Sequence, residues 1–300
     1  MRFLPAAEAA VAAGLVAPLQ PLFHLDALWI QVAGTLCNLT CTHCFVSSGP
    51  GDDHHALMAR DEVRNHVADG LALGAKEFYF TGGEPFVHPA MLEIIEETLE
   101  HGPVTVLTNG TLFTRERVAA LARLAAASRY ALELRVSLDG PSAAEHDRLR
   151  GPGSFERALA GLRALTAAGL LPIVTATQGA GDQAMALIER YLVMLHDAGI
   201  ARPRLKLLPM FQLGREVARS RGYEPAETLI GLPPAAFDPH RLQCSGCRAV
   251  TSRGVFVCPL LVDEPGGRMA GSLDRALGPF ALRFGACYTC HVTGMTCGNG

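Results

Sequence analysis

Short apolar segments alternate with longer amphipathic segments along most of the chain. The apolar segments, rich in β-branched residues, predict strands at 27–34, 76–82, 104–110, 132–140, 171–178 and 204–211. The segments between them carry apolar residues three and four positions apart, which predicts helices at 60–73, 89–101, 115–127, 154–169 and 183–199. Strands in which polar and apolar residues do not alternate regularly are typical of a sheet that is covered on both faces.

This order of elements predicts an α/β fold with a parallel sheet. Strands that alternate with helices are joined by right-handed crossovers, which build either a full or partial barrel or an open doubly wound sheet. No G-x-G-x-x-G motif follows the first strand, and this favours a barrel over a dinucleotide-binding sheet. We expect a helical extension over 1–26, the barrel over 27–213, a bridging segment over 214–243 and a small cysteine-rich domain over 244–300.

Composition narrows the class of protein. The chain has 300 residues, 49% of them hydrophobic, which is enough for one large core and an appendage. A net charge of -3 leaves no basic surface for nucleic acid, and no apolar run is long enough to span a membrane. Pro5 and Glu8 interrupt the N-terminal apolar stretch, so we expect an amphipathic helix rather than a signal peptide, and a cytoplasmic protein.

The nine cysteines form two separate groups. Three of them lie within residues 37–44, and the other six lie after residue 243. In a reducing compartment, clustered cysteines indicate metal binding or catalysis rather than disulfides. The sequence therefore predicts one cysteine site near each end of the chain.

Unusual residues follow the predicted strands where the strands end. The first cysteine group follows the first strand, TGGEP (81–85) the second, Asn109 the third and SLDG (137–140) the fourth. Each alone is compatible with an ordinary turn or helix cap. In a barrel, however, these strand ends share one rim, where the chemistry of such folds takes place. Three thiolates there suit an iron–sulfur cluster with one open iron, whereas a structural zinc ion takes four ligands.

Two motifs in this order resemble those of the radical S-adenosylmethionine (radical SAM) superfamily. CNLTCTHC (37–44) has the pattern C-x3-C-x2-C, and TGGEP follows the second strand. The resemblance covers about residues 27–211 and implies a partial (β/α)6 TIM barrel. It also implies reductive cleavage of S-adenosylmethionine to a 5′-deoxyadenosyl radical, which abstracts hydrogen from a small metabolite or peptide. A flavodoxin- or ferredoxin-type protein would be the one-electron reductant.

The resemblance also implies roles for individual residues. Cys37, Cys41 and Cys44 would ligate a 4Fe–4S cluster, whose fourth iron binds the amine and carboxylate of the cofactor. Glu84 and the glycines before it would meet the amine, and Ser137 and Arg150 would hold the carboxylate, although Arg150 is also compatible with a solvated surface arginine. The cofactor-binding residues implied in this way are His43, Gly82, Gly83, Glu84, Asn109, Ser137 and Arg150.

The late cysteines form the patterns C-x2-C-x10-C (244–258) and C-x2-C-x6-C (287–297), around a predicted hairpin and turn at 254–273. They resemble a shortened SPASM or Twitch domain, which implies at least one auxiliary 4Fe–4S cluster. The first candidate ligands are Cys244, Cys258 and Cys287, followed by Cys247, Cys290 and Cys297. Two C-x2-C pairs are also typical of a zinc site, to which His291 could contribute.

Two functions therefore remain open at this point. One is a radical SAM enzyme whose auxiliary cluster helps to bind or oxidise the substrate. The other is a non-catalytic metal-binding scaffold with a zinc-stapled C-terminal cap. Because only about 26 residues precede the first strand, we expect no dedicated leader-peptide-binding domain. The sequence does not indicate which substrate is used.

Overall fold

The computed structural model describes residues 16–179 and 183–294. Within them, the main sheet has nine strands in the order β10-β9-β8-β2-β3-β4-β5-β6-β7, and β8 and β2 to β7 are parallel. The strands are β2 (Ala27–Gln31), β3 (Glu77–Thr81), β4 (Val104–Thr108), β5 (Leu132–Ser137), β6 (Ile173–Gln178), β7 (Arg204–Pro209), β8 (Cys247–Thr251), β9 (Gly254–Phe256) and β10 (Arg268–Ala270).

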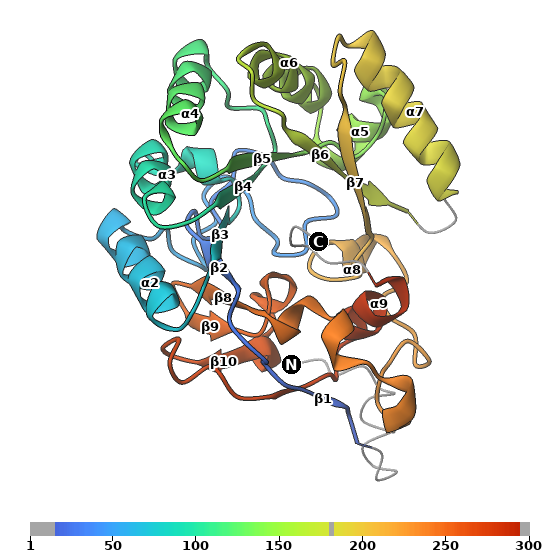
Figure 1. Ribbon diagram of the computed structural model, residues 1–300. Helices are drawn as coiled ribbons and strands as arrows, with labels where there is room; N and C mark the ends of the chain where they lie inside the picture. The colour runs from blue at the N-terminus through green and yellow to red at the C-terminus, as the bar shows by residue number, and fades with distance from the viewer. Residues whose placement is uncertain (1–15, 180–182, 295–300) are drawn as a thin grey trace.

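The helices that follow these strands lie along the outer side of the curved sheet, as Figure 1 shows for α2, α3, α4, α6 and α7. The α-helices are α2 (Arg60–Ala72), α3 (Met91–Leu99), α4 (Arg115–Ala127), α5 (Ala143–Arg150), α6 (Ser154–Ala167), α7 (Ala184–Asp197), α8 (Glu216–Arg219) and α9 (Gly285–Thr293). Short 3-10 helices are η1 (Pro85–Val87), η2 (Pro234–Ala236), η3 (Pro239–Arg241), η4 (Gln243–Ser245), η5 (Pro259–Leu261) and η6 (Pro265–Gly267). The prediction of a partial (β/α)6 barrel is confirmed.

One helix of the barrel, α5, was not predicted from the sequence. Ser142 caps its N-terminus by accepting a hydrogen bond from the Glu145 N–H at 3.4 Å. Its residues are mostly polar and it buries only His146, so it lacks the apolar stripe by which helices are recognised in a sequence. This helix matters for the site because it ends at Arg150.

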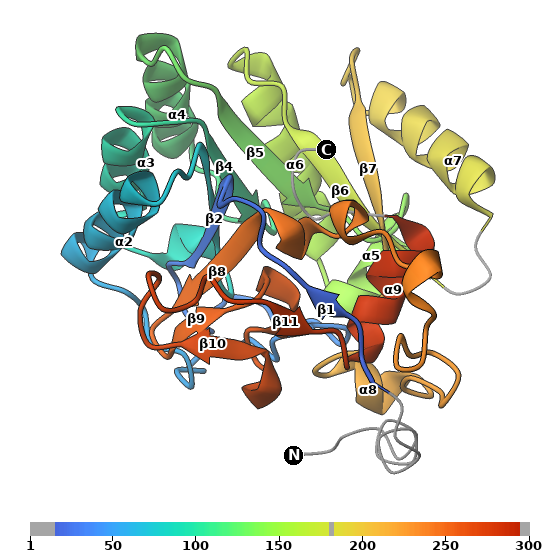
Figure 2. The same ribbon diagram turned by 60° about the horizontal axis from the view of Figure 1, so that its bottom comes forward.

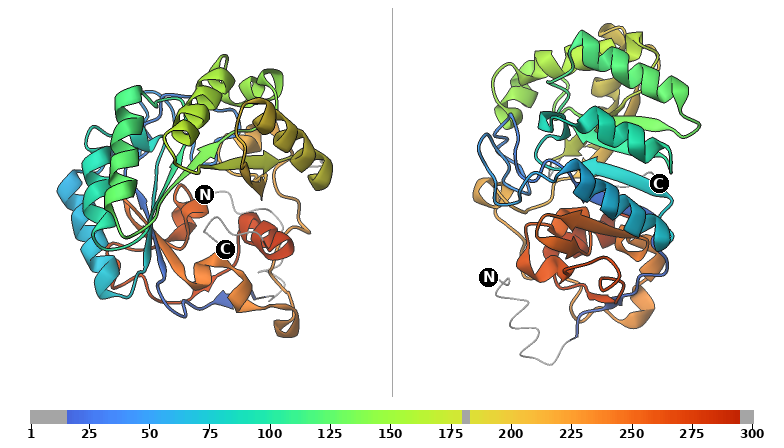
Figure 3. Two further views of the ribbon diagram at one scale, coloured as in Figure 1. Left: turned by 45° about the horizontal axis from the view of Figure 1, so that its top comes forward. Right: turned by 90° about the vertical axis from the view of Figure 1, so that its left-hand side faces the viewer.

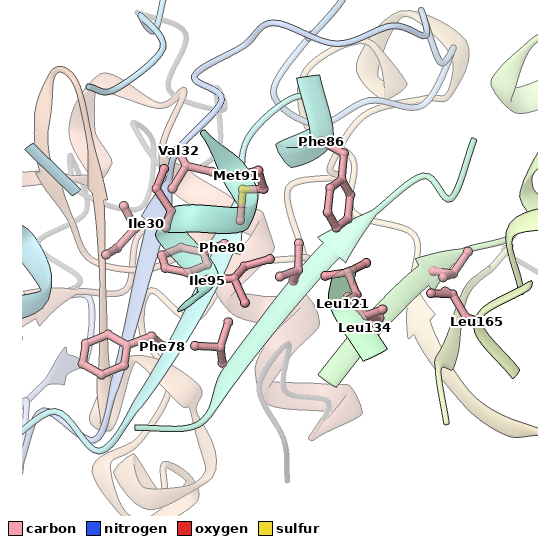
Figure 4. Close-up of a cluster of buried hydrophobic side chains, with 14 of the residues drawn as sticks. Ile30, Val32, Phe78, Phe80, Phe86, Met91, Ile95, Leu121, Leu134 and Leu165 are labelled. Carbon is pink, nitrogen blue, oxygen red and sulfur yellow. The ribbon is translucent and has the colours of Figure 1, made fainter. Parts of the chain in front are cut away.

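Strands β2 and β3 are largely apolar and buried, because both faces of the sheet are covered there. In β2, Leu28 and Ile30 belong to the core under the outer helices, whereas Trp29 belongs to a second core shared with the C-terminal region. The Trp29 ring stacks on Tyr79 at a centroid distance of 4.2 Å. Figure 4 shows the first core, with Ile30, Phe78, Phe80, Ile95, Leu121, Leu134 and Leu165 among its labelled side chains. Each fully buried side chain of this kind stabilises the fold by about 1.5–3 kcal/mol.

The C-terminal region continues the barrel sheet. Strand β8 pairs in parallel with β2, and β9 and β10 follow as antiparallel strands, so β9 and β10 form the hairpin predicted within 254–273. Figures 1 and 3 show this orange-to-red region along the open side of the partial barrel. The inner face of β2 is therefore buried by the region that carries the late cysteines, so the two parts of the chain share one hydrophobic core.

The segment before the barrel is extended where the structure describes it. Strand β1 (Leu19–Gln20) pairs antiparallel with β11 (Phe280–Ala281), and the two lie side by side in Figure 2. Most of the helical extension expected over 1–26 falls in residues 1–15, outside the described residues, and residues 16–26 contain β1 rather than a helix. Across the described parts of the chain, every helix is too short or too polar to cross a bilayer.

Candidate cluster and cofactor site at the barrel rim

The first three cysteines lie in a loop that leaves β2 at the rim of the barrel. Backbone hydrogen bonds close this loop on itself, from the Cys37 N–H to the Gly49 carbonyl at 3.1 Å and from the Gly49 N–H to the Thr35 carbonyl at 3.2 Å. The Thr42 N–H donates to the carbonyl of Leu149 at 2.8 Å, which joins the loop to the end of α5. We call residues 34–49 the cysteine loop.

The sulfur atoms of the cysteine loop are in surroundings that suit metal-bound thiolates. Backbone N–H groups point at two of them, from Leu39 to Cys37 Sγ at 3.4 Å and from Ser48 to Cys44 Sγ at 3.3 Å. Burial raises the pKa of Cys37 to about 12 and also raises the pKa of Cys41. Thiolates at these positions therefore require a cation beside them, as iron provides. This donor set fits a cluster with three protein ligands.

Gly82 and Gly83 let the turn after β3 pack directly on the cysteine loop. A Cβ atom on Gly83 would lie 2.3 Å from the Leu36 carbonyl oxygen, and one on Gly82 would lie 2.8 Å from the Ala33 Cβ. Gly82 also has a φ of +144°, which side-chain-bearing residues rarely adopt. The Gly83 N–H donates to the carbonyl of Gly34 at 2.9 Å. These glycines therefore allow a close packing of two backbone segments, and their contact with the cofactor amine stays a prediction.

Glu84 joins the end of β3 to the end of β4. Its carboxylate is completely buried and accepts three hydrogen bonds, from Thr108 Oγ1 at 2.7 Å, the Asn109 N–H at 2.7 Å and the Phe86 N–H at 3.0 Å. Burial raises the pKa of Glu84, while these three donors act in the opposite direction. The contact between Glu84 and the cofactor amine stays a prediction, but the structure gives this residue a further role in positioning the rim.

Glu84→Gln is expected to lower the free energy of unfolding by about 1–3 kcal/mol, because an amide NH2 would replace one acceptor oxygen opposite buried donors. Urea unfolding followed by circular dichroism measures this loss. The matched control is Glu96→Gln, because Glu96 is an exposed residue of α3 and its replacement should change stability by less than about 0.5 kcal/mol. Equal stability of the two variants would contradict the positioning role.

Asn109 links the end of β4 to the cysteine loop. Its Nδ2 donates to Asn38 Oδ1 at 2.8 Å and lies 3.9 Å from Cys37 Sγ. Its Oδ1 accepts a hydrogen bond from Thr111 Oγ1 at 2.7 Å. Asn109 therefore lies beside the cysteine loop, and these hydrogen bonds fix the orientation of its amide. Its contact with the cofactor stays a prediction.

An ion pair between Asp139 and Arg150 forms the other side of the site. Asp139 Oδ2 lies 2.6 Å from Arg150 Nε and 2.9 Å from His43 Nε2, and Oδ1 accepts the Thr177 N–H at 2.8 Å. Burial alone would raise the pKa of Asp139, but Arg150 and His43 outweigh it and hold that pKa well below its usual range. The Arg150 side chain is only 14% exposed, and its Nη1 lies 4.0 Å from Cys41 Sγ.

Arg150 is therefore held against the cysteine loop and is not a solvated surface arginine. Asp139 was not among the predicted cofactor-binding residues, since an acidic residue after a strand is also an ordinary cap. His43 is brought to the site, with its ring paired to Asp139. Ser137 ends β5 nearby and is half-buried, and its contact with the cofactor stays a prediction.

An open cavity of about 680 Å³ adjoins this ion pair. Asp139 and Thr177 line it together with Gln178, Met210 and Gln212, which follow or end β6 and β7. The bridging segment contributes Glu216, Arg219, Ser220 and Arg221 to the same wall. The rim residues of the last strands thus converge on a space large enough for a substrate.

Four of the late cysteines share a second, smaller and apolar cavity. They are Cys244, Cys258, Cys287 and Cys290, which come from η4, the segment after β9 and one face of α9. Burial raises the pKa of both Cys244 and Cys287 to about 12. Cys247 is buried on β8 and is not part of this lining, and Cys297 lies outside the described residues. Four thiols that line one cavity match the ligand number of either an iron–sulfur cluster or a structural zinc ion.

Arg248 holds the first part of this cysteine site in place. Its fully buried guanidinium donates to the carbonyls of Ala276 at 2.7 Å, Cys247 at 2.8 Å, Gly278 at 2.9 Å and Cys244 at 3.1 Å. The sequence did not predict this structural role of Arg248. An arginine in a short strand does not indicate that backbone carbonyls from other parts of the chain will surround it.

Comparisons with known proteins agree with the geometry of the rim. The family model of the radical SAM superfamily matches residues 32–179. An AdoMet-dependent heme synthase of Methanosarcina barkeri (strain Fusaro / DSM 804) is 39% identical over 142 residues, which are 46% of this chain and 38% of that relative. The mycofactocin maturase MftC of Mycobacterium tuberculosis (strain CDC 1551 / Oshkosh) is 34% identical over 134 residues, which are 44% of this chain and 32% of the relative.

The chain thus spans less than half the length of these two relatives. Among solved structures, Streptococcus suis SuiB bound to its precursor peptide SuiA superposes with a TM-score of 0.58 over 86% of this chain and 64% of SuiB, at 17% identity. A likeness at this level of identity shows a shared fold.

Proposed function

Because its residues 32–179 belong to the radical SAM superfamily, we propose that this chain is an enzyme that reductively cleaves S-adenosylmethionine to a 5′-deoxyadenosyl radical, which takes a hydrogen atom from a substrate C–H bond. The observation that carries the proposal is that the cysteine loop packs against the buried Asp139–Arg150 pair, with Cys41 Sγ 4.0 Å from Arg150 Nη1. An iron–sulfur cluster and S-adenosylmethionine supply the radical chemistry when they are bound.

The chain's own residues provide binding, orientation and exclusion of water in this proposal. Cys37, Cys41 and Cys44 hold the cluster, and Arg150 binds the carboxylate of the cofactor through its planar guanidinium. Asp139 orients that guanidinium and, as its negatively charged partner, favours its charged form although the group is buried. The buried rim limits access of water and of stray hydrogen donors to the reacting atoms.

The substrate is proposed to enter the open cavity beside Asp139, and to be a peptide or another small molecule. The shared fold with a protein solved with a precursor peptide makes a peptide compatible with this cavity. A flavodoxin- or ferredoxin-type protein is the proposed reductant. We further propose that Cys244, Cys258, Cys287 and Cys290 hold one auxiliary 4Fe–4S cluster, which assists binding or oxidation of the substrate.

Anaerobic reconstitution tests the function. Protein supplied with iron and sulfide should turn brown and, with dithionite, convert S-adenosylmethionine to 5′-deoxyadenosine and methionine, as measured by liquid chromatography and mass spectrometry. Protein kept without iron and assayed in the same way is the control. A colourless zinc protein that leaves S-adenosylmethionine intact would instead support a non-catalytic metal-binding scaffold.

A further inference from the structure

Two histidines and one aspartate meet at a place that neither cysteine site uses. His54 and His55 follow the cysteine loop, and Asp263 follows η5 in the C-terminal region. His54 Nε2 lies 3.1 Å from Asp263 Oδ1, and His55 Nε2 lies 3.6 Å from the same oxygen. One donor atom from each of the three residues lies within 4.8 Å of the other two.

His55 is the least ordinary member of this group. Its side chain is completely buried, its Nδ1 has no hydrogen-bond partner, and its Nε2 has only Asp263 Oδ1, at 3.6 Å. A buried polar nitrogen left in this way costs about 1–3 kcal/mol. The residue is also fixed by its backbone, since its N–H donates to Thr35 Oγ1 at 3.2 Å and its carbonyl accepts the Thr35 N–H at 3.0 Å. An imidazole held rigidly with Nε2 facing a carboxylate is suited to bind a cation.

The separations between these atoms fit a metal ion. Ligand atoms about 2.0–2.1 Å from a tetrahedral ion lie about 3.4 Å from one another. The two nitrogen distances to Asp263 Oδ1, 3.1 Å from His54 and 3.6 Å from His55, fall on either side of that value. Two imidazoles and one carboxylate form a nitrogen and oxygen set that zinc accepts, and three protein ligands leave a fourth position for water.

We propose that His54, His55 and Asp263 bind one Zn²⁺ ion that joins the segment after the cysteine loop to the C-terminal region. The ligands are 208 positions apart along the chain, from His55 to Asp263. A hydrogen bond from the Ala56 N–H to Ser252 Oγ at 2.8 Å connects the same two parts beside the site. The ion therefore stabilises the packing of the C-terminal region against the cysteine loop and takes no thiolate ligand.

The test is zinc binding to the chain after anaerobic iron–sulfur reconstitution, which occupies the cysteines first. Equilibrium dialysis against ZnSO4, with zinc and iron counted by mass spectrometry, should give one zinc ion per chain. Asp263→Asn keeps the side-chain shape, and His54→Ala removes a side chain that is 36% exposed, so both variants should fold. Each should bind this zinc at least about 100-fold more weakly.

His24→Ala is the matched control, because His24 Nε2 also lies close to a carboxylate, 2.6 Å from Asp26 Oδ2, but outside this cluster. It should keep the zinc ion and its affinity. A second measurement compares thermal unfolding of zinc-loaded and chelated protein, in which zinc should raise the melting temperature of the wild type and of His24→Ala only. Zinc binding of unchanged affinity in Asp263→Asn and His54→Ala, or none in the wild type, would overturn the proposal.

Discussion

Replacing Cys37, Cys41 and Cys44 together by Ala will abolish the formation of 5′-deoxyadenosine from S-adenosylmethionine. The reason is that no thiolate then remains in the cysteine loop to hold the iron that supplies the electron. The loop itself should persist, because it is closed by backbone hydrogen bonds such as that from the Cys37 N–H to the Gly49 carbonyl. Anaerobic assay of the reconstituted variant, with circular dichroism to check the fold, measures the effect.

The control for this first prediction is Cys247→Ala, which removes another buried thiol from a position outside both the cysteine loop and the shared cavity. It should form 5′-deoxyadenosine at the wild-type rate. The triple variant should also keep the iron held by the late cysteines, so the loss can be assigned to one site. A triple variant that is folded and still cleaves S-adenosylmethionine at the wild-type rate would refute the proposed cluster site.

Replacing the four cysteines of the second cavity by Ala is expected to halve the iron content. The wild type should hold about eight iron atoms per chain after reconstitution, and the variant about four, because each 4Fe–4S cluster contributes four. The variant should still cleave S-adenosylmethionine while losing turnover of its substrate. Binding and folding of such a site are coupled, so the C-terminal region should also unfold at a lower temperature.

Cys247→Ala again serves as the control and should keep all the iron, because this thiol lies on β8 and outside the shared cavity. About four iron atoms and one zinc ion in the wild type, with that zinc lost in the four-cysteine variant, would reject the auxiliary cluster and identify a zinc-stapled cap. Zinc bound by His54, His55 and Asp263 is distinguished from this case, because it would remain in the four-cysteine variant.

The sequence by itself determined the alternation of strands and helices and the three-cysteine motif. Both are local properties. Apolar, β-branched runs indicate the strands, and apolar residues three and four positions apart indicate the helices other than α5. The three cysteines lie close together in the sequence, so a single loop holds all of them. The parallel order of the strands then brings residues such as Asn109 to a common rim, which is why the candidate residues could be named before their contacts were known.

Only the tertiary structure decided which distant residues meet. Arg150 becomes a site residue because α5, a polar helix without an apolar stripe, ends opposite Asp139 and the cysteine loop. In the same way, pairing of β8 with β2 sets the C-terminal region against the barrel. That packing gathers four of the late cysteines around one cavity and brings His55 to Asp263. Such contacts depend on how whole helices and strands pack against one another. That packing cannot be predicted from the residues that neighbour a given position in the sequence.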